Sequence, residues 1–322
     1  MSAGRDCRLR AALLLTVCLV APLGAEQYAV VVTGASGGEA YAAKYDRWRT
    51  TFVSLLRETF GYPADHVLVL AERPDASAGP ATRDGVRRLF ASLQARVTKD
   101  DQLLVLLIGH GTSLEQDEAK FNLVGPDLRA REWADLLRPI AGRVIFVGGS
   151  SASAPFLRAI AAPGRIVITA TDSAAQSFET VFPEYFIRAF SDAASDTDKN
   201  GRVSLLEAFD YASAAVRRSY EQKGQLPTER ALLDDNGDGI GRESGAPGAD
   251  GLLARTAFLQ PPVAGSDVAS SELRRQQAAL EAQIDALKGT RASMPADAYN
   301  KELERLLTEL ARVSAQVRSK TP

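Results

Sequence analysis

Short runs of apolar residues alternate along the chain with segments whose apolar residues recur every three or four positions. The clearest run is Leu103–Ile108, six apolar residues in succession, which is typical of a strand buried on both faces of a parallel sheet. Further runs indicate strands at 27–33, 66–70, 143–148 and 165–171. The segments between them predict amphipathic helices over about 45–56, 86–97, 133–140 and 156–160. This alternation predicts an α/β fold in which helices cover both faces of a parallel sheet.

The remaining segments lack this alternation. Residues 113–128 show no periodicity and are expected to form a loop, whereas 252–259 is expected to return as an edge strand or packed segment. The α/β unit is therefore expected to span 26–260, followed by a linker at 261–271 with Pro261, Pro262 and Gly265. In the tail, leucine, isoleucine and valine recur at helical spacing over 272–318. This pattern predicts a helical hairpin or a coiled-coil arm through which chains could self-associate.

The first residues have the composition of an export signal. Arg5, Arg8 and Arg10 precede the apolar run 11–20, and small residues follow up to Ala25. Residues 1–25 are therefore predicted to be a signal peptide that is removed, so the protein would be secreted or periplasmic with no stable membrane span. Both cysteines lie in this leader, so the mature chain would contain no thiol.

Charge patterning excludes one class of partner. The formal net charge is −2 and basic residues are dispersed among acidic ones. A nucleic-acid surface requires a concentrated basic patch, so nucleic-acid binding is not expected.

A calcium-binding loop is the most specific motif in the chain. In the twelve residues 196–207, side-chain oxygens fall at loop positions one, three, five and twelve, supplied by Asp196, Asp198, Asn200 and Glu207. Gly201 stands at the sharp turn of position six, and Arg202 can offer its carbonyl oxygen at position seven. Six to eight hard oxygen ligands suit Ca²⁺. The stretch resembles an EF-hand loop, and helices are expected on both sides.

The start of the same pattern recurs farther along the chain. Asp234, Asn236 and Asp238 have the spacing of positions one, three and five, with Gly239 at position six. Position twelve would be Gly245, which has no side-chain ligand, and no outgoing helix is expected. The stretch is either a partial second calcium loop or an ordinary turn rich in aspartate, asparagine and glycine.

A second set of candidate residues follows two neighbouring predicted strands. Gly109-His110-Gly111 comes directly after the run 103–108, and the small-residue turn Gly149–Ala154 follows the strand at 143–148. Functional groups of open α/β sheets gather at the carboxyl ends of strands. His110 is therefore a candidate catalytic or binding residue, and its flanking glycines allow close approach of another backbone.

Over about residues 27–259 this order resembles the caspase-like cysteine peptidases, the group that includes caspases and legumains. Their histidine follows one strand and their cysteine the next, in a pattern similar to Asp-Ala-Cys-His-Ser-Gly. The resemblance implies a caspase-like sheet between helices and places His110, the Gly111 amide and Ser151 at the family's catalytic positions. Serine thus stands where the cysteine nucleophile would be.

Two functions follow from this resemblance. The first is a pseudo-peptidase that binds a peptide or protein and is stabilised by calcium. The alternative is a peptidase or acyl hydrolase in which Ser151 acts with His110. A serine hydroxyl has a much higher pKa than a thiol and needs a well-oriented base, and no acidic residue is evidently placed to orient His110.

Overall fold

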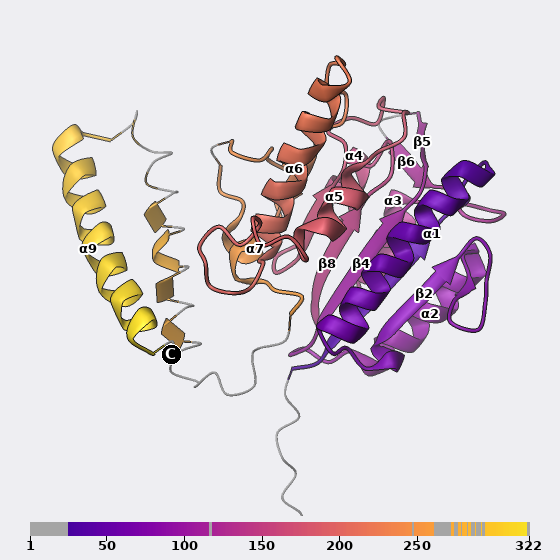
Figure 1. The fold of residues 1–322 in the computed structure, drawn as a ribbon, viewed down its shortest axis with the longest axis horizontal. Coiled ribbons are helices and arrows are strands. Elements are labelled where there is room, and N and C mark those ends of the chain that lie inside the picture. The colour runs from indigo at the N-terminus through magenta and orange to yellow at the C-terminus, as the bar shows by residue number, and fades with distance from the viewer. Residues whose placement is uncertain are drawn as a thin grey trace, which may run out of the picture.

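The computed structural model describes residues 25–115, 118–246 and 248–260 (Figure 1). Beyond residue 260 it describes the segments 272–273, 276–277, 279–281, 283–284, 287, 291 and 294–320. The expected leader, apart from Ala25, and the expected linker at 261–271 lie outside the described residues.

The centre of the fold is a seven-stranded sheet with the order β10-β9-β8-β4-β1-β2-β3. All neighbouring strands are parallel except β10, which runs antiparallel to β9 at one edge. The strands are β1 Gln27–Thr33, β2 Val67–Ala71, β3 Gly79–Pro80, β4 Gln102–Ile108, β8 Arg143–Gly148, β9 Ile166–Thr169 and β10 Leu232–Asp234. The five strands expected from apolar runs are all present.

Helices cover both faces of this sheet, as the strand–helix alternation predicts (Figure 1). One face carries α1 Glu39–Ser54 with a π-helical end at Leu55–Thr59, α5 Phe182–Ala189 and α6 Leu205–Gln222. The other face carries α2 Arg83–Arg96, α3 Ala130–Leu137 and α4 Ala154–Ile160. Successive residues of β4 enter alternate cores, Leu104 and Leu106 on the first face and Leu103 and Val105 on the second. The predicted α/β architecture is therefore confirmed.

One segment differs from the expectation, and for another the structure decides between two alternatives. Residues 113–128 do not form a plain loop, because β5 Gly111–Leu114, β6 Glu118–Phe121 and β7 Leu128–Arg129 build a small antiparallel sheet. In β6, Ala119 and Phe121 are buried and alternate with more exposed residues, a pattern too short to recognise in the sequence. Of the two alternatives for 252–259, the segment is packed rather than an edge strand: it contains the short helix α7 Leu252–Thr256 and buries Ala254 and Leu259, and Phe258 bridges to Ser204.

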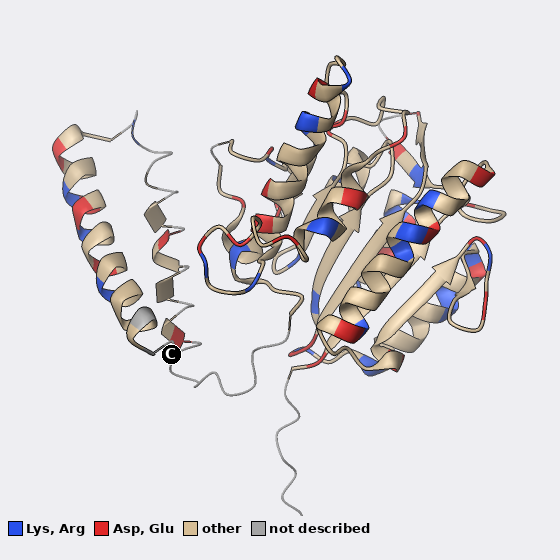
Figure 2. Ribbon diagram, in the orientation of Figure 1, with Lys and Arg blue, Asp and Glu red and all other residues tan. Residues whose placement is uncertain are grey.

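The C-terminal segments pack against each other through an apolar seam. Leu280 and Ile284 are buried together with Leu306 and Val313 of α9 Ala296–Lys320. Both signs of charge are interspersed along α9 (Figure 2). This packing is what a helical hairpin requires, and an ion pair of 3.2 Å between Arg255 and Glu281 links the segment to α7. In the part of the chain that the structure describes, no helix combines the length and apolar character needed to cross a bilayer.

The chain changes direction between β1 and β4. From β1 it continues outward to β2, whereas from β4 it continues to β8 on the opposite side. At such a switch point the two connections diverge and leave a crevice at the carboxyl ends of the strands. Ser36 and His110 both follow these strand ends, so the fold itself marks this edge as the place for a site.

A buried carboxylate from another part of the chain caps the N-terminus of α5. Glu229 is 3% exposed, and its two oxygens accept hydrogen bonds from the amides of Val181 at 2.9 Å and Phe182 at 2.6 Å. A negative charge at a helix N-terminus is favourable, but burial dominates and raises the pKa of Glu229 to about 7. Glu229, which lies shortly before β10, thereby anchors the segment 171–181 that leads into α5.

Burial of Glu229 makes the stability of the protein depend on pH. Between pH 4.5, the usual pKa of the group, and about 7, the folded chain retains a proton that the unfolded chain has released. The stabilisation from this protonated carboxyl group is therefore complete below this window. As pH rises through the window, the free energy of unfolding falls by about 3 kcal/mol. We expect unfolding measured across this range to show a smaller decline for Glu229→Gln. Glu184→Gln, at an exposed position in α5, is the control and should retain the wild-type slope.

Candidate functional site

His110 lies at the carboxyl end of β4 and contacts two groups from the neighbouring part of the chain. Its Nε2 is 3.1 Å from the carbonyl oxygen of Ser36 and 3.1 Å from the hydroxyl of Tyr45. Because a carbonyl oxygen can only accept, the first contact favours the tautomer that carries its proton on Nε2. The lone pair is then on Nδ1. A backbone carbonyl thus orients this histidine, which explains why the sequence contains no evident acidic partner.

Aromatic residues of α1 form a wall beside the imidazole. The ring of Tyr41 meets His110 edge-on at 5.0 Å between centroids, and that of Tyr45 at 5.6 Å. Burial, with Glu179 and Tyr41 nearby, raises the pKa of Tyr45 far above its ordinary value, so its hydroxyl stays neutral. Lys44 lies 5.4 Å from the Tyr41 ring centre and pairs with Glu179 at 2.6 Å. Tyr41 remains 37% exposed, so this wall is open to a ligand.

Sequence reasoning missed these neighbours of His110. The helical spacing of Tyr45 indicates a core residue, and it is indeed buried. Ser36 acts through its backbone carbonyl, which leaves no trace in the residue type. The one available signal was the position of both residues just beyond the first predicted strand, at the edge where His110 is expected.

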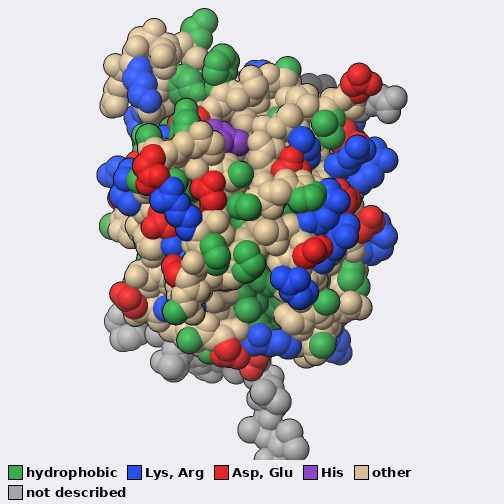
Figure 3. Space-filling model, turned by 90° about the vertical axis from the view of Figure 1, so that its right-hand side faces the viewer, with side chains coloured by type: hydrophobic (Ala, Val, Ile, Leu, Met, Phe, Trp, Pro, Cys, Tyr) green, Lys and Arg blue, Asp and Glu red, His purple; other side chains and the backbone are tan. Residues whose placement is uncertain are grey.

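A cavity of about 420 Å³ opens beside this point. Its wall includes Ser36 and Tyr45, the two contacts of His110, and the ends of β1 and β2. Charged side chains of both signs line it, namely Glu39, Asp46, Arg49, Glu72, Arg73 and Asp75. Figure 3 shows basic and acidic side chains intermixed across one face of the molecule, with a histidine near the upper edge. The cavity is large enough for a polar side chain of a bound peptide.

Ser151 is paired with Gly111 rather than with His110. The Ser151 hydroxyl donates to the Gly111 carbonyl at 3.1 Å and accepts from the Gly111 amide at 3.1 Å. The serine is only 1% exposed. Although His110, Gly111 and Ser151 gather at one edge as expected, no hydrogen bond joins the two candidate catalytic side chains among the described contacts of these residues.

Hydrogen bonds from the segment 171–181 hold the turn that carries Ser151. Ala152 adopts a left-handed conformation with φ of 51°, and its amide donates to the Gln176 carbonyl at 2.8 Å. Ser153 and Thr171 hydrogen-bond through their hydroxyls and backbone. A left-handed non-glycine residue costs energy that its surroundings must offset. The backbone of the turn is therefore fixed, and the Ser151 hydroxyl can leave its position only by giving up its two hydrogen bonds with Gly111.

The predicted calcium loop brings its carboxylates together. Asp196, Asp198 and Glu207 each offer an oxygen, and these oxygens all lie within 4.8 Å of one another. Burial and the neighbouring Glu207 raise the pKa of Asp198 to about 6. The Arg202 guanidinium lies 4.0 Å from the centre of the Phe258 ring and donates to the Gln260 carbonyl. An all-oxygen donor set with several carboxylates fits Ca²⁺.

The backbone of this loop turns in the manner that the pattern predicts. Lys199 and Gly201, at positions four and six, have φ of 58° and 83°. Asp196 accepts the amides of Asn200 at 3.0 Å and Gly201 at 2.9 Å. Glu207 lies in the first turn of α6, which begins within the loop, whereas α5 ends at Ala189, seven residues before Asp196. Helices thus stand on both sides of the loop as expected, although the incoming helix ends before the first ligand position.

The second loop repeats only the first half of this geometry. Gly237 and Gly239 have φ of 82° and 77° at the same two positions, and Asp234 accepts both of their amides. Asn236 accepts from the amide of Asp238, and Asp238 accepts from that of Ile240. In the chain that the structure describes, only the first loop gathers three acidic side chains at ligand distance. The second loop thus has the turn but not the closing carboxylate.

Close approach of two strand ends explains the second glycine of Gly109-His110-Gly111. A Cβ at position 111 would lie 2.1 Å from the Ser151 carbonyl oxygen, which belongs to the rigid backbone of the turn. We therefore expect Gly111→Ala to lower the free energy of unfolding by about 3 kcal/mol, because overpacking forces the backbone to shift. Chemical denaturation would measure this loss. Unchanged stability would show that the two strand ends separate easily.

Comparison with known proteins finds similarity among solved structures but none in sequence. No family model matches the chain, and no curated protein matches it in sequence. Among solved structures, it is similar to caspase-1 from Spodoptera frugiperda, with 10% sequence identity and a TM-score of 0.45. That alignment covers 66% of this chain and 89% of the caspase chain.

Proposed function

We propose that this protein binds a peptide or protein segment at the carboxyl edge of its parallel sheet and does not cleave it. The observation that carries the proposal is the reciprocal pair of hydrogen bonds between Ser151 and Gly111. It occupies both groups that acyl transfer would require, the hydroxyl as nucleophile and the amide as oxyanion donor. The caspase-like arrangement of residues supports a site at this edge.

Chemistry at Ser151 would need a different set of contacts. A serine attacks a carbonyl only when a base accepts its proton, and the base must lie within hydrogen-bond reach. Here the proton is directed to the Gly111 carbonyl. The oxyanion formed in the reaction needs donors aimed at it, but the Gly111 amide is aimed at Ser151 itself. A serine-dependent peptidase or acyl hydrolase is therefore the second candidate.

Several features of the edge favour binding. The exposed Tyr41 ring and the imidazole of His110 provide a surface on which a peptide side chain can pack. The large cavity beside Ser36 and Tyr45 offers polar and charged groups for a second side chain. His110 Nδ1 is free to accept a hydrogen bond from a peptide amide when Nε2 carries the proton.

Calcium is proposed to stabilise this protein rather than take part in binding chemistry. Asp196, Asp198, Asn200 and Glu207 would hold the ion through side chains, and Arg202 through its carbonyl oxygen. The ion would neutralise carboxylates that otherwise crowd together and would tie the loop to α6. Asp234, Asn236 and Asp238 are proposed as a second and weaker calcium loop.

The proposed location and assembly of the protein rest on sequence signals. Residues 1–25 are proposed to direct export, so that the mature chain is secreted or periplasmic, where free Ca²⁺ can occupy the loop. The C-terminal helices are proposed to contribute to self-association.

A serine-directed fluorophosphonate probe distinguishes the two candidate functions. We expect no labelling of the wild-type protein, because the Ser151 hydroxyl is buried and its proton is directed away from His110. Gel fluorescence after incubation with the probe is the measurement. Labelling that disappears in Ser151→Ala and His110→Ala, yet persists in the control Ser150→Ala, would establish the hydrolase instead.

The binding arm of the same test uses an array of extended fluorescent peptides and anisotropy. Peptides that bind the wild type should bind Ser151→Ala equally well, because the serine is not a ligand contact. Tyr41→Ala should weaken them by about tenfold, since a stacked aromatic contact contributes roughly 0.5–1.5 kcal/mol. An array without any binder would refute the proposed binding site.

Chelation tests the calcium proposal. Excess EDTA should lower the melting temperature by several degrees, because an ion at a hundred times its Kd stabilises by about 3 kcal/mol. Glu207→Gln should abolish most of this difference. It should keep the N-terminal cap of α6, in which the Glu207 side chain accepts the Ser204 amide, since glutamine also serves at that position. Glu221→Gln, exposed in the same helix, is the matched control.

A melting temperature that excess chelator leaves unchanged would overturn the calcium proposal. Titration calorimetry would count the ions, and a second ion lost in Asp238→Asn would assign the second loop as well.

A further inference from the structure

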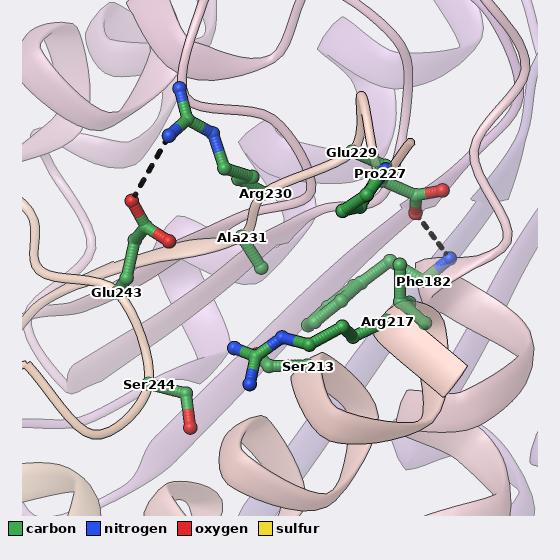
Figure 4. A pocket seen from close by; sticks show the side chains of 10 residues that line it. Phe182, Ser213, Arg217, Pro227, Glu229, Arg230, Ala231, Glu243 and Ser244 are labelled. Carbon is green, nitrogen blue, oxygen red and sulfur yellow. Dashed lines mark hydrogen bonds and ion pairs between the residues drawn. The ribbon is translucent and has the colours of Figure 1, made fainter. Parts of the chain in front are cut away.

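We propose that a small cavity between α5, α6 and the segment preceding β10 binds a carboxylate group through Arg217. The cavity has a volume of about 70 Å³, and its residues come from four separate parts of the chain (Figure 4). Because Leu232 of β10 pairs with Thr169 at the end of β9, the cavity lies toward the carboxyl edge of the sheet. It is separate from the residues that surround His110.

Apolar side chains form the floor of this cavity. Phe182 is fully buried, and Val216 and Ala231 are 3% and 7% exposed. Ser213 and Ser244 are polar members of the lining. Charged side chains complete the lining and Arg217 is solvent-exposed, so the apolar floor shields a ligand on one side while polar groups on the other can hold it.

The acidic groups of the lining already have partners. Glu229 accepts the amides of Val181 and Phe182. Glu243 lies 3.6 Å from Arg230, which also pairs with Asp172. Both carboxylates therefore interact with other groups of the protein, and neither pairs with Arg217.

Arg217 is the cationic residue of the lining that has no ion-pair partner among the described residues. Within the described chain, no carboxylate lies at ion-pair distance from its guanidinium and no hydrogen bond to it is formed. In Figure 4 the side chain extends across the cavity beside Phe182, and no interaction joins it to the other labelled residues. Its guanidinium therefore presents several N–H donors to whatever enters.

The chemistry and the volume together select a carboxylate. The planar fork of arginine donates two parallel hydrogen bonds to a carboxylate. The cavity has room for about two water molecules, which suits a carboxylate with one or two carbon atoms attached. That group could belong to a small free acid or to an acidic side chain of a peptide.

Thermal unfolding with sodium acetate tests the site, using sodium chloride at equal ionic strength as the reference. Acetate should raise the melting temperature of the wild type above that in chloride. Arg217→Gln should weaken the apparent affinity by at least about tenfold, because a charge-assisted bidentate contact is lost. Arg218→Gln removes the next arginine of α6, which does not line the cavity, and should behave as wild type.

Binding of a glutamate-containing peptide and of its glutamine analogue, measured by calorimetry, identifies the source of the carboxylate. Acetate binding alone indicates a free acid, and preference for the glutamate peptide that is lost in Arg217→Gln indicates a side chain. Equal behaviour of the wild type and Arg217→Gln with both probes would overturn the proposal. A response to inorganic phosphate without any response to the carboxylates would overturn it too.

Discussion

The parallel pairing of β1 with β4 is the contact on which the rest of this structure depends. Seven residue pairs, from Gln27 with Gln102 to Thr33 with Ile108, align the two strands so that they end together. The chain leaves these ends in opposite directions, which opens the crevice where Ser36 and His110 meet. Because both strands are buried on both faces, a shift of register would expose core residues and displace the histidine from its carbonyl partner.

Two levels of constraint determine where the Ser151 hydroxyl lies relative to His110. The backbone places His110 and Ser151 on adjacent strands, as the resemblance to caspase-like peptidases implies. The local hydrogen bonds then direct the serine hydroxyl to Gly111, while the left-handed Ala152 and the segment 171–181 fix the turn. Placement at one sheet edge therefore does not by itself couple the two side chains, since proton transfer depends on contacts of about 3 Å.

The segment between β9 and α5 connects the features of this edge. It holds the turn of Ser151 through Gln176 and Thr171, and its Glu179 pairs with Lys44 in the aromatic wall. It is anchored in turn by Glu229, which borders the proposed carboxylate cavity. A change of charge at Glu229 would thus act on contacts that reach both proposed binding places.

The sequence by itself determined the sheet, the helices on its two faces and the edge that carries His110. Apolar runs and helical periodicity report burial directly, and the spacing within 196–207 predicts the tight turn at Gly201. The small sheet of β5–β7 was missed because four-residue strands carry too little periodicity. Only the tertiary structure decided that the Ser36 carbonyl orients His110, that Ser151 is bound to Gly111, and that Arg217 faces a cavity. Those contacts join residues that are distant in the chain. Two of them involve backbone groups, so the residue types do not predict them.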